Sequence, residues 1–226
     1  MQIVVVSSPG LGGQPHWSHE VAGAFARLAV ARGATVRWLA GLHAGQPIPP
    51  GEAGLQVVAH QDRKVYPAGA VNPSQLDAQL ELALTECLRL EPLSAVVHFG
   101  LGAQGTPNVL WLADRMGSKT FACVRGVELV CHRGDLLDRD KVICTEWSSA
   151  DRCRWCCSDA AKPKPSSDDM LNRVDLFIAG LATAAGIFVS EADEVDYVTS
   201  LGVSAKGIEV GATAEQILDS VIASAN

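Results

Sequence analysis

Short apolar runs alternate with longer stretches of mixed polarity along most of the chain. Most of the runs are nearly continuous, which is typical of strands that are buried on both faces. They predict seven strands, at residues 2–7, 35–40, 55–59, 95–99, 120–124, 186–190 and 207–210. The stretches between them predict six helices, at residues 17–32, 73–90, 106–116, 169–185, 191–201 and 214–225. Gly33 and Gly117 lie where the first and third helices are expected to end.

Strands that alternate with helices favour a parallel sheet with helices on both faces. Because crossovers between parallel strands are right-handed, the pattern predicts an α/β, doubly wound, Rossmann-like fold with about seven mostly parallel strands. We expect residues 1–226 to form a single domain of this kind. Such sheets bind ligands outside the carboxyl ends of their strands. The segments that follow the strands are therefore the places to look for function.

The segment 125–165 breaks the alternation of strands and helices. It holds five of the seven cysteines and two tryptophans, and no helix or strand is predicted within it. A segment of that length without regular structure needs a functional reason or remains disordered. A bound metal would supply the core that this Cys-rich insertion lacks.

The cysteines of this insertion have a spacing that suits a metal ion. The pattern is Cys131-x12-Cys144-x8-Cys153-x2-Cys156, followed directly by Cys157. Four thiolates arranged as a tetrahedron suit Zn²⁺, with bonds of about 2.3 Å. We therefore expect a structural zinc site at Cys131, Cys144, Cys153 and Cys156.

Other interpretations of these cysteines stay open. Cys157 and His132 are substitute ligands for the same ion. Cys153 and Cys156 could instead form a redox pair, the set could bind an iron–sulfur cluster, or the thiols could be free. The two remaining cysteines, Cys87 and Cys123, fall in a predicted helix and strand and are expected to be core residues.

Two further features lie at the carboxyl ends of predicted strands. Gly12 and Gly13 follow the first strand and precede the first long helix, where free backbone N–H groups favour an anionic ligand. The segment lacks the G-x-G-x-x-G spacing and the Walker ending, so a plain tight turn is an equal alternative. His98 ends a central strand, which is where this architecture places its chemistry, although a single His is more often structural.

Composition narrows the function further. Eighteen Lys and Arg against 25 Asp and Glu give a net charge of −7, while 48% of the residues are hydrophobic. These values exclude a disordered chain and disfavour binding to nucleic acid or to anionic lipid. No secretory leader and no apolar run of about 20 residues is visible, so we expect a cytoplasmic protein without a transmembrane segment.

Four stretches, in this order, resemble a known family. The first strand leads through Gly12-Gly13 to a helix that begins near His16, and residues 93–100 are similar to a D-V-V-H-x-H strand. Residues 129–137, with the cysteines after them, resemble an L-C-P-R-G-x-L…C…C-x-x-C insertion. Residues 185–203 are similar to an A-D-x-V-I-x-x-S…G-V element. Together they resemble the N-terminal, acceptor-side domain of GT-B glycosyltransferases of the retaining family-4 type, in the subset with cysteines.

The resemblance implies an enzyme of two Rossmann-like domains with the active site in the cleft between them. Only one helix is predicted after Gly211, so we expect no donor-binding domain within the chain and no glycosyl transfer by the chain alone. The family's His-Asp pair after the central strand is replaced by Arg125-Gly126, and His98 lacks a second His beside it.

Two functional hypotheses follow from the resemblance. In the first, the chain is the acceptor-side half of a split glycosyltransferase that needs a partner donor-binding chain or a second copy of itself, with a sugar or nucleotide sugar bound in the complex. Arg125 would then stabilise phosphate charge. In the second, the chain is a non-catalytic binding or interaction module with a structural metal site. No catalytic residue is assigned. The candidate substrate-binding residues are Gly12, Gly13, Gln14, His16, His98 and Arg125.

Overall fold

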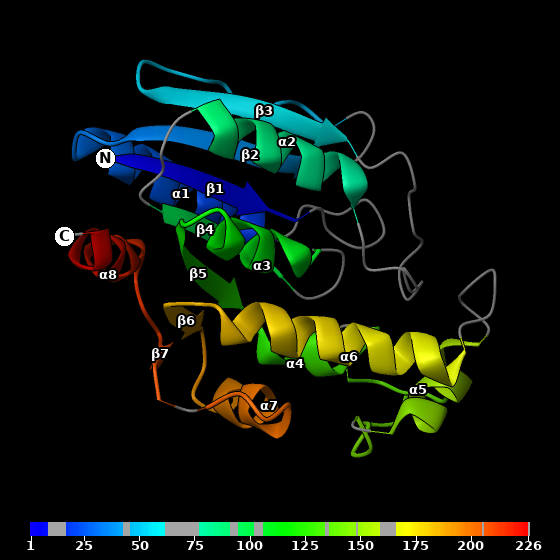
Figure 1. Cartoon of the computed structure of the whole chain (residues 1–226). Helices are drawn as coiled ribbons and strands as arrows, with labels where there is room; N and C mark the ends of the chain where they lie inside the picture. The colour runs from blue at the N-terminus through cyan, green and yellow to red at the C-terminus, as the bar shows by residue number, and fades with distance from the viewer. Residues whose placement is uncertain are drawn as a thin grey trace.

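Seven parallel strands form one sheet in the computed structural model (Figure 1). The structure describes residues 1–8, 17–42, 46–61, 77–90, 95–101, 106–133, 136–147, 149–158, 166–204 and 206–225. The strands are β1 (Gln2–Ser7), β2 (Thr35–Leu42), β3 (Leu55–Gln61), β4 (Ala95–Phe99), β5 (Lys119–Val124), β6 (Gly186–Val189) and β7 (Ile208–Val210). Their order in the sheet is β3-β2-β1-β4-β5-β6-β7. The predicted α/β, doubly wound class is confirmed, and every predicted strand boundary lies within two residues of the observed one.

Helices cover both faces of this sheet. They are α1 (Trp17–Ala31), α2 (Ala78–Leu90), α3 (Asn108–Arg115), α4 (Gly126–Val130), α5 (Ala150–Cys157), α6 (Ser167–Ala182), α7 (Glu194–Ser200) and α8 (Ala214–Ala225). Figure 1 shows α2, α3 and α6 side by side over one face, and α1 packs with α8 on the other. The first turns of the predicted second helix lie outside the described residues.

The continuous apolar runs are explained by burial on both faces. In β1, Ile3 and Val5 pack into the cluster under α1 and α8, whereas Val4 and Val6 pack into the cluster under α2 and α3. All four side chains are at most 1% exposed. Alternate positions of one strand therefore face two different apolar layers, so no polar position interrupts the run.

The strand order reverses between β1 and β4, which are paired neighbours. Beyond their carboxyl ends, the Ser8 amide donates to the Phe99 carbonyl across 3.2 Å, and the Gly100 amide donates to the Cys123 carbonyl across 2.9 Å. Gly100 has φ of +75°, a conformation that favours glycine. Ligands of doubly wound folds bind at this reversal, so the carboxyl ends of β1, β4 and β5 define the edge to examine.

The Cys-rich insertion contains regular structure that the sequence did not predict. It includes α4, an antiparallel bridge between Leu137 and Ile143, and α5, which packs on the first turns of α6 (Figure 1). The Cys153 and Cys156 pair lies inside α5, where the sequence predicted no helix.

The helix predicted to begin at residue 191 begins at Glu194. The Glu194 carboxylate accepts from the Ser190 and Glu191 amides at 2.9 and 3.1 Å, so these residues form the turn that precedes the helix. No helix among the described residues is long and apolar enough to cross a membrane.

Candidate functional site

The carboxyl end of β1 is bonded to the first turn of α1. The Ser7 hydroxyl accepts a hydrogen bond from the Trp38 indole at 2.9 Å and lies 3.1 Å from His19 Nδ1. The Ser18 hydroxyl donates to the Ser8 carbonyl at 3.2 Å. These contacts fix the start of α1 beside the sheet edge, and Trp17 is the first residue of this helix.

Trp17 joins the start of α1 to α4, which directly follows β5. Its indole Nε1 donates to Glu128 Oε1 across 2.9 Å, between residues 111 positions apart in sequence. Glu128 is only 6% exposed. The guanidinium of Arg125, an exposed residue, lies 5.4 Å from the Trp17 ring centroid, within the range of a cation–π contact. The edge thus presents a half-buried aromatic ring between a carboxylate and a guanidinium.

Arg173 of α6 stabilises α4 through hydrogen bonds to its backbone. Its guanidinium donates to the Glu128 and Leu129 carbonyls at 2.6 and 2.7 Å and stacks on the Phe177 ring at 4.5 Å. The residue is 2% exposed. Burial lowers the pKa of Arg173 to about 10, so the guanidinium still carries its charge at neutral pH.

The structure describes two of the six predicted substrate-binding residues, His98 and Arg125. Gly12, Gly13, Gln14 and His16 lie outside the described residues. Arg125 stands at the sheet edge, as described above. His98 is fully buried, and neither ring nitrogen has a hydrogen-bond partner among the described residues. Burial lowers its pKa to about 3, which keeps the ring neutral. With no exposed atom, His98 can contact a ligand only if its covering side chains move, and its binding role stays a prediction.

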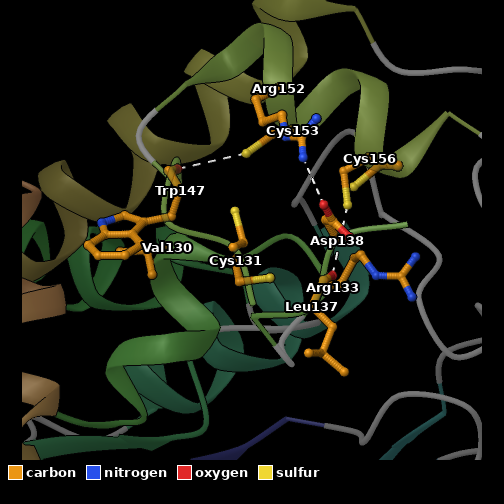
Figure 2. Close-up of a pocket in the computed structure, with 11 residues that line it drawn as sticks. Val130, Cys131, Arg133, Leu137, Asp138, Trp147, Arg152, Cys153 and Cys156 are labelled. Carbon is orange, nitrogen blue, oxygen red and sulfur yellow. Dashed lines mark hydrogen bonds and ion pairs between the residues drawn. The ribbon is translucent and has the colours of Figure 1, made fainter. Parts of the chain in front are cut away.

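The structure brings together all four cysteines predicted to bind zinc. Cys131, Cys144, Cys153, Cys156 and Cys157 line one small cavity of about 20 Å³. Figure 2 shows Cys153 and Cys156 extending from α5 on one side of this cavity, with Cys131 on the other side. Cys131 immediately follows α4. His132 is not among the residues that line the cavity, which disfavours it as a substitute ligand.

Burial affects the acidity of the thiols that α5 supplies. Burial raises the pKa of both Cys153 and Cys157 to about 12. Cys153 Sγ donates to the Trp147 carbonyl at 3.7 Å, and Cys156 Sγ donates to the Leu137 carbonyl at 3.9 Å. Among the described residues, no three His, Cys, Asp or Glu side chains are arranged to hold a metal ion as they stand. The cysteines thus line the same cavity, but their sulfur atoms are not arranged as the ligands of one metal ion.

A short hairpin carries Cys144 to this cavity. Asp138 Oδ1 accepts from the Asp140 and Val142 amides at 2.9 and 3.0 Å, and Oδ2 accepts from Arg152 of α5 at 2.7 Å. These hydrogen bonds, with the Arg152 charge, hold the pKa of Asp138 below its usual range. Asp138 therefore fastens the hairpin to α5.

Sequence reasoning did not identify Trp17, Glu128, Arg173 or Asp138. A signal existed for Arg173, which shares a helical stripe with Met170, Phe177 and Leu181, all buried. An Arg on the apolar side of a helix needs buried hydrogen-bond acceptors, so its position in this stripe indicates a buried polar contact. The Trp17–Glu128 contact has no signal in sequence spacing, because the two residues are 111 positions apart and meet only in the folded chain.

No family model matches the chain, and no curated protein matches it. Among solved structures, it is similar to the lipopolysaccharide outer core galactosyltransferase WaaB, with 7% identity over 93% of this chain and 45% of that one, and a TM-score of 0.45. It is also similar to a UDP-glucosyltransferase from Polygonum tinctorium that glucosylates indoxyl, with 15% identity over 92% and 51% and a TM-score of 0.43.

A third similar structure belongs to a different class of protein. It is the C-terminal domain of the coenzyme A biosynthesis bifunctional protein CoaBC, with 16% identity over 54% of this chain and 64% of that one, and a TM-score of 0.36. The chain spans about half the length of the two transferases and less than two thirds of the CoaBC domain. The strand order β3-β2-β1-β4-β5-β6-β7 establishes the doubly wound fold class.

Proposed function

We propose that these residues form the acceptor-side domain of a glycosyltransferase-like enzyme whose donor-binding domain lies outside the 226 residues. One observation carries the proposal: Trp17, Arg125 and Glu128 meet at the carboxyl edge of the sheet, beside the point where the strand order reverses. The order of the family-like motifs along the sequence supports it.

The chemistry of this group suits a sugar hydroxyl acceptor. An indole ring offers a flat apolar face against which the C–H face of a sugar ring can pack. Arg125 provides up to five N–H donors, and its exposure leaves them available to hydroxyl or phosphate oxygens. Glu128 accepts a hydrogen bond from the indole N–H and so holds the ring in place. In a transfer reaction, such a site contributes by positioning the acceptor rather than by covalent chemistry.

A second candidate is a non-catalytic binding module. It is favoured by Arg125-Gly126, which stands where the resembled family carries His-Asp at the start of α4. In this case the edge binds a sugar but the domain takes part in no transfer. Both candidates require a sugar at the same edge, and they differ in whether an added donor domain gives turnover.

Fluorine NMR of protein labelled with 5-fluorotryptophan tests the shared requirement. The five tryptophans give five resonances, which Trp→Phe variants assign. Glucose, galactose, mannose, N-acetylglucosamine and UDP are titrated separately. We expect at least one sugar to shift the Trp17 resonance in a saturable manner, while the resonance of Trp111 on α3, which is 44% exposed, stays in place.

A matched pair of variants gives the control. Arg115 stacks on Trp111 at 5.0 Å, in the same kind of contact as Arg125 on Trp17. The R125Q variant should weaken sugar binding several-fold, whereas R115Q should leave it unchanged. If no sugar moves the Trp17 resonance, or if both variants weaken binding equally, the edge is not an acceptor site and the proposal is wrong.

A further inference from the structure

We propose that Cys131, Cys144, Cys153 and Cys156 bind one Zn²⁺ ion, and that this ion joins α4 to α5. The inference does not depend on the glycosyltransferase-like function. It rests on the convergence of the cysteines, on a buried cation beside them, and on the small size of the apolar cluster that the described residues of this region form.

The ligands come from three separate segments that meet at one cavity. Cys131 caps α4, Cys144 ends the hairpin, and α5 supplies the remaining two (Figure 2). The Cys144 amide donates to the Leu136 carbonyl at 2.7 Å, which fixes the hairpin close to its thiol. A cavity of about 20 Å³ holds one water-sized body. A lining with five sulfurs suits a soft metal ion better than a water molecule, which needs several polar partners.

The choice of Cys156 over Cys157 follows from their directions on α5. Both lie one helical turn from Cys153, so either could bind the same metal ion together with it. Cys156 reaches toward the hairpin, since its Sγ contacts the Leu137 carbonyl. Cys157 is 1% exposed and packs with Met170 of α6 in the small apolar cluster there. Cys156 therefore contacts the hairpin that carries Cys144, whereas Cys157, which also lines the cavity, shows no such contact among the described residues and is almost fully buried.

Arg173 gives the second, independent observation. Zn²⁺ with four thiolates has a net charge of 2−, which is costly to bury without a nearby cation. Arg173 is a buried guanidinium whose charge lies close enough to interact with Cys131 and Cys153. It also donates to the Glu128 and Leu129 carbonyls in the last turn of α4, three and two residues before Cys131. Such a residue orients and compensates the metal centre from outside its ligand shell.

The apolar core of this region is too small to order it. The cluster between α5 and α6 consists of Cys153, Cys157 and Met170, with Ala150 packed against it. Two of its three buried members are cysteines. A metal ion would therefore supply the cross-links that the apolar side chains do not, as in other small metal-bound modules.

Binding is a proton-coupled step. Each of the four S–H bonds breaks, its proton goes to solvent, and the sulfur electron pair forms a bond to Zn²⁺, so four protons leave for one ion bound. Cys153 and Cys156 then give up their hydrogen bonds to the Trp147 and Leu137 carbonyls and turn toward the shared cavity. All four positions around the ion are filled by protein, so the centre is structural.

Elemental analysis of protein purified without added metal is the first test. We expect about one equivalent of zinc per chain, falling below a tenth in the C144A and C153A variants. Two control variants should retain the metal: C157A, from the same helix, and C87A, a buried cysteine of α2. Loss of zinc from C157A equal to that from C153A would overturn the ligand assignment. Less than a tenth of an equivalent in the parent protein after incubation with Zn²⁺ would overturn the site.

A second readout keeps the test informative if the variants do not fold. The parent protein is stripped with a chelator, and hydrogen exchange is followed by mass spectrometry. We expect residues 126–157 to lose protection while β1 and β4 keep theirs, and readdition of Zn²⁺ to restore it. Unchanged exchange on stripping would contradict the structural role. Iron with a visible absorption band, or disulfides in the purified protein, would overturn the zinc assignment.

Discussion

Replacing His98 with leucine should remove about 2.7 kcal/mol of the protein's loss of stability between pH 7.5 and pH 4.5. The folded state holds this ring neutral, because burial lowers its pKa from 6.5 to about 3. In the unfolded state the His98 ring takes up a proton as the pH falls through about 6.5, whereas in the folded state the ring stays unprotonated. The stability that depends on neutral His98 is therefore complete above pH 6.5 and is lost as the pH falls towards 3.

The size of this effect follows from the two pKa values. At pH 4.5 the folded ring is still neutral while the unfolded ring has been protonated over two pH units, which costs about 2.7 kcal/mol at about 1.36 kcal/mol per unit. A domain is stable by roughly 5–15 kcal/mol, so the loss is a large fraction of the total.

Urea unfolding at several pH values, with H98L and H98N beside the parent protein, measures the effect. Other groups titrate alike in all three proteins, so the difference in free energy of unfolding isolates His98. Relative to the parent, both variants should gain about 2.7 kcal/mol between pH 7.5 and pH 4.5, whatever their stability at pH 7.5. A difference that stays constant over this range would refute the argument that the ring is held neutral by burial.

Three further predictions concern α4, the hairpin and activity. In G126A the new Cβ would lie 2.5 Å from the Glu194 carbonyl oxygen, so urea unfolding should show a loss of about 1–3 kcal/mol; an unchanged midpoint would contradict this packing. The D138N variant keeps the acceptor for the two hairpin amides but places an NH₂ group against Arg152, so hydrogen exchange should rise in the hairpin and α5 but not in β4. The 226 residues alone should release no nucleotide from UDP-, GDP- or ADP-sugars in a coupled assay, and robust turnover would show that no donor-binding domain is needed.

The strands of the sheet could be predicted because the signals that identify them lie in neighbouring residues of the sequence. The run Ile3–Val6 is buried on both faces, so its side chains alone identify the strand. Gly33 and Gly117 were expected to end helices, and both have φ of +84°. These features depend on neighbouring residues in the sequence and need no knowledge of distant contacts.

The Cys-rich insertion could not be predicted in the same way. Helix α4 is only five residues long and contains one glycine and two valines, so it shows no helical period. Helix α5 is mostly polar, and the residues on its buried face are cysteines rather than aliphatic side chains. The spacing of the cysteines predicted one zinc site at four of them, which stays a prediction, and all five line one cavity. It could not show that Arg173, from another helix, would lie beside them.

Helix α4 links the two proposals: Cys131 at its end is a proposed ligand of the metal ion, and Arg125 and Glu128 at its start lie at the sheet edge. X-ray absorption at the zinc edge, on protein as purified, tests the proposed metal centre most directly. We expect a single shell of four sulfur atoms at about 2.3 Å, with no nitrogen or oxygen neighbour. A shell of oxygen or nitrogen atoms at about 2.0–2.2 Å, or one with fewer than three sulfurs, would contradict it.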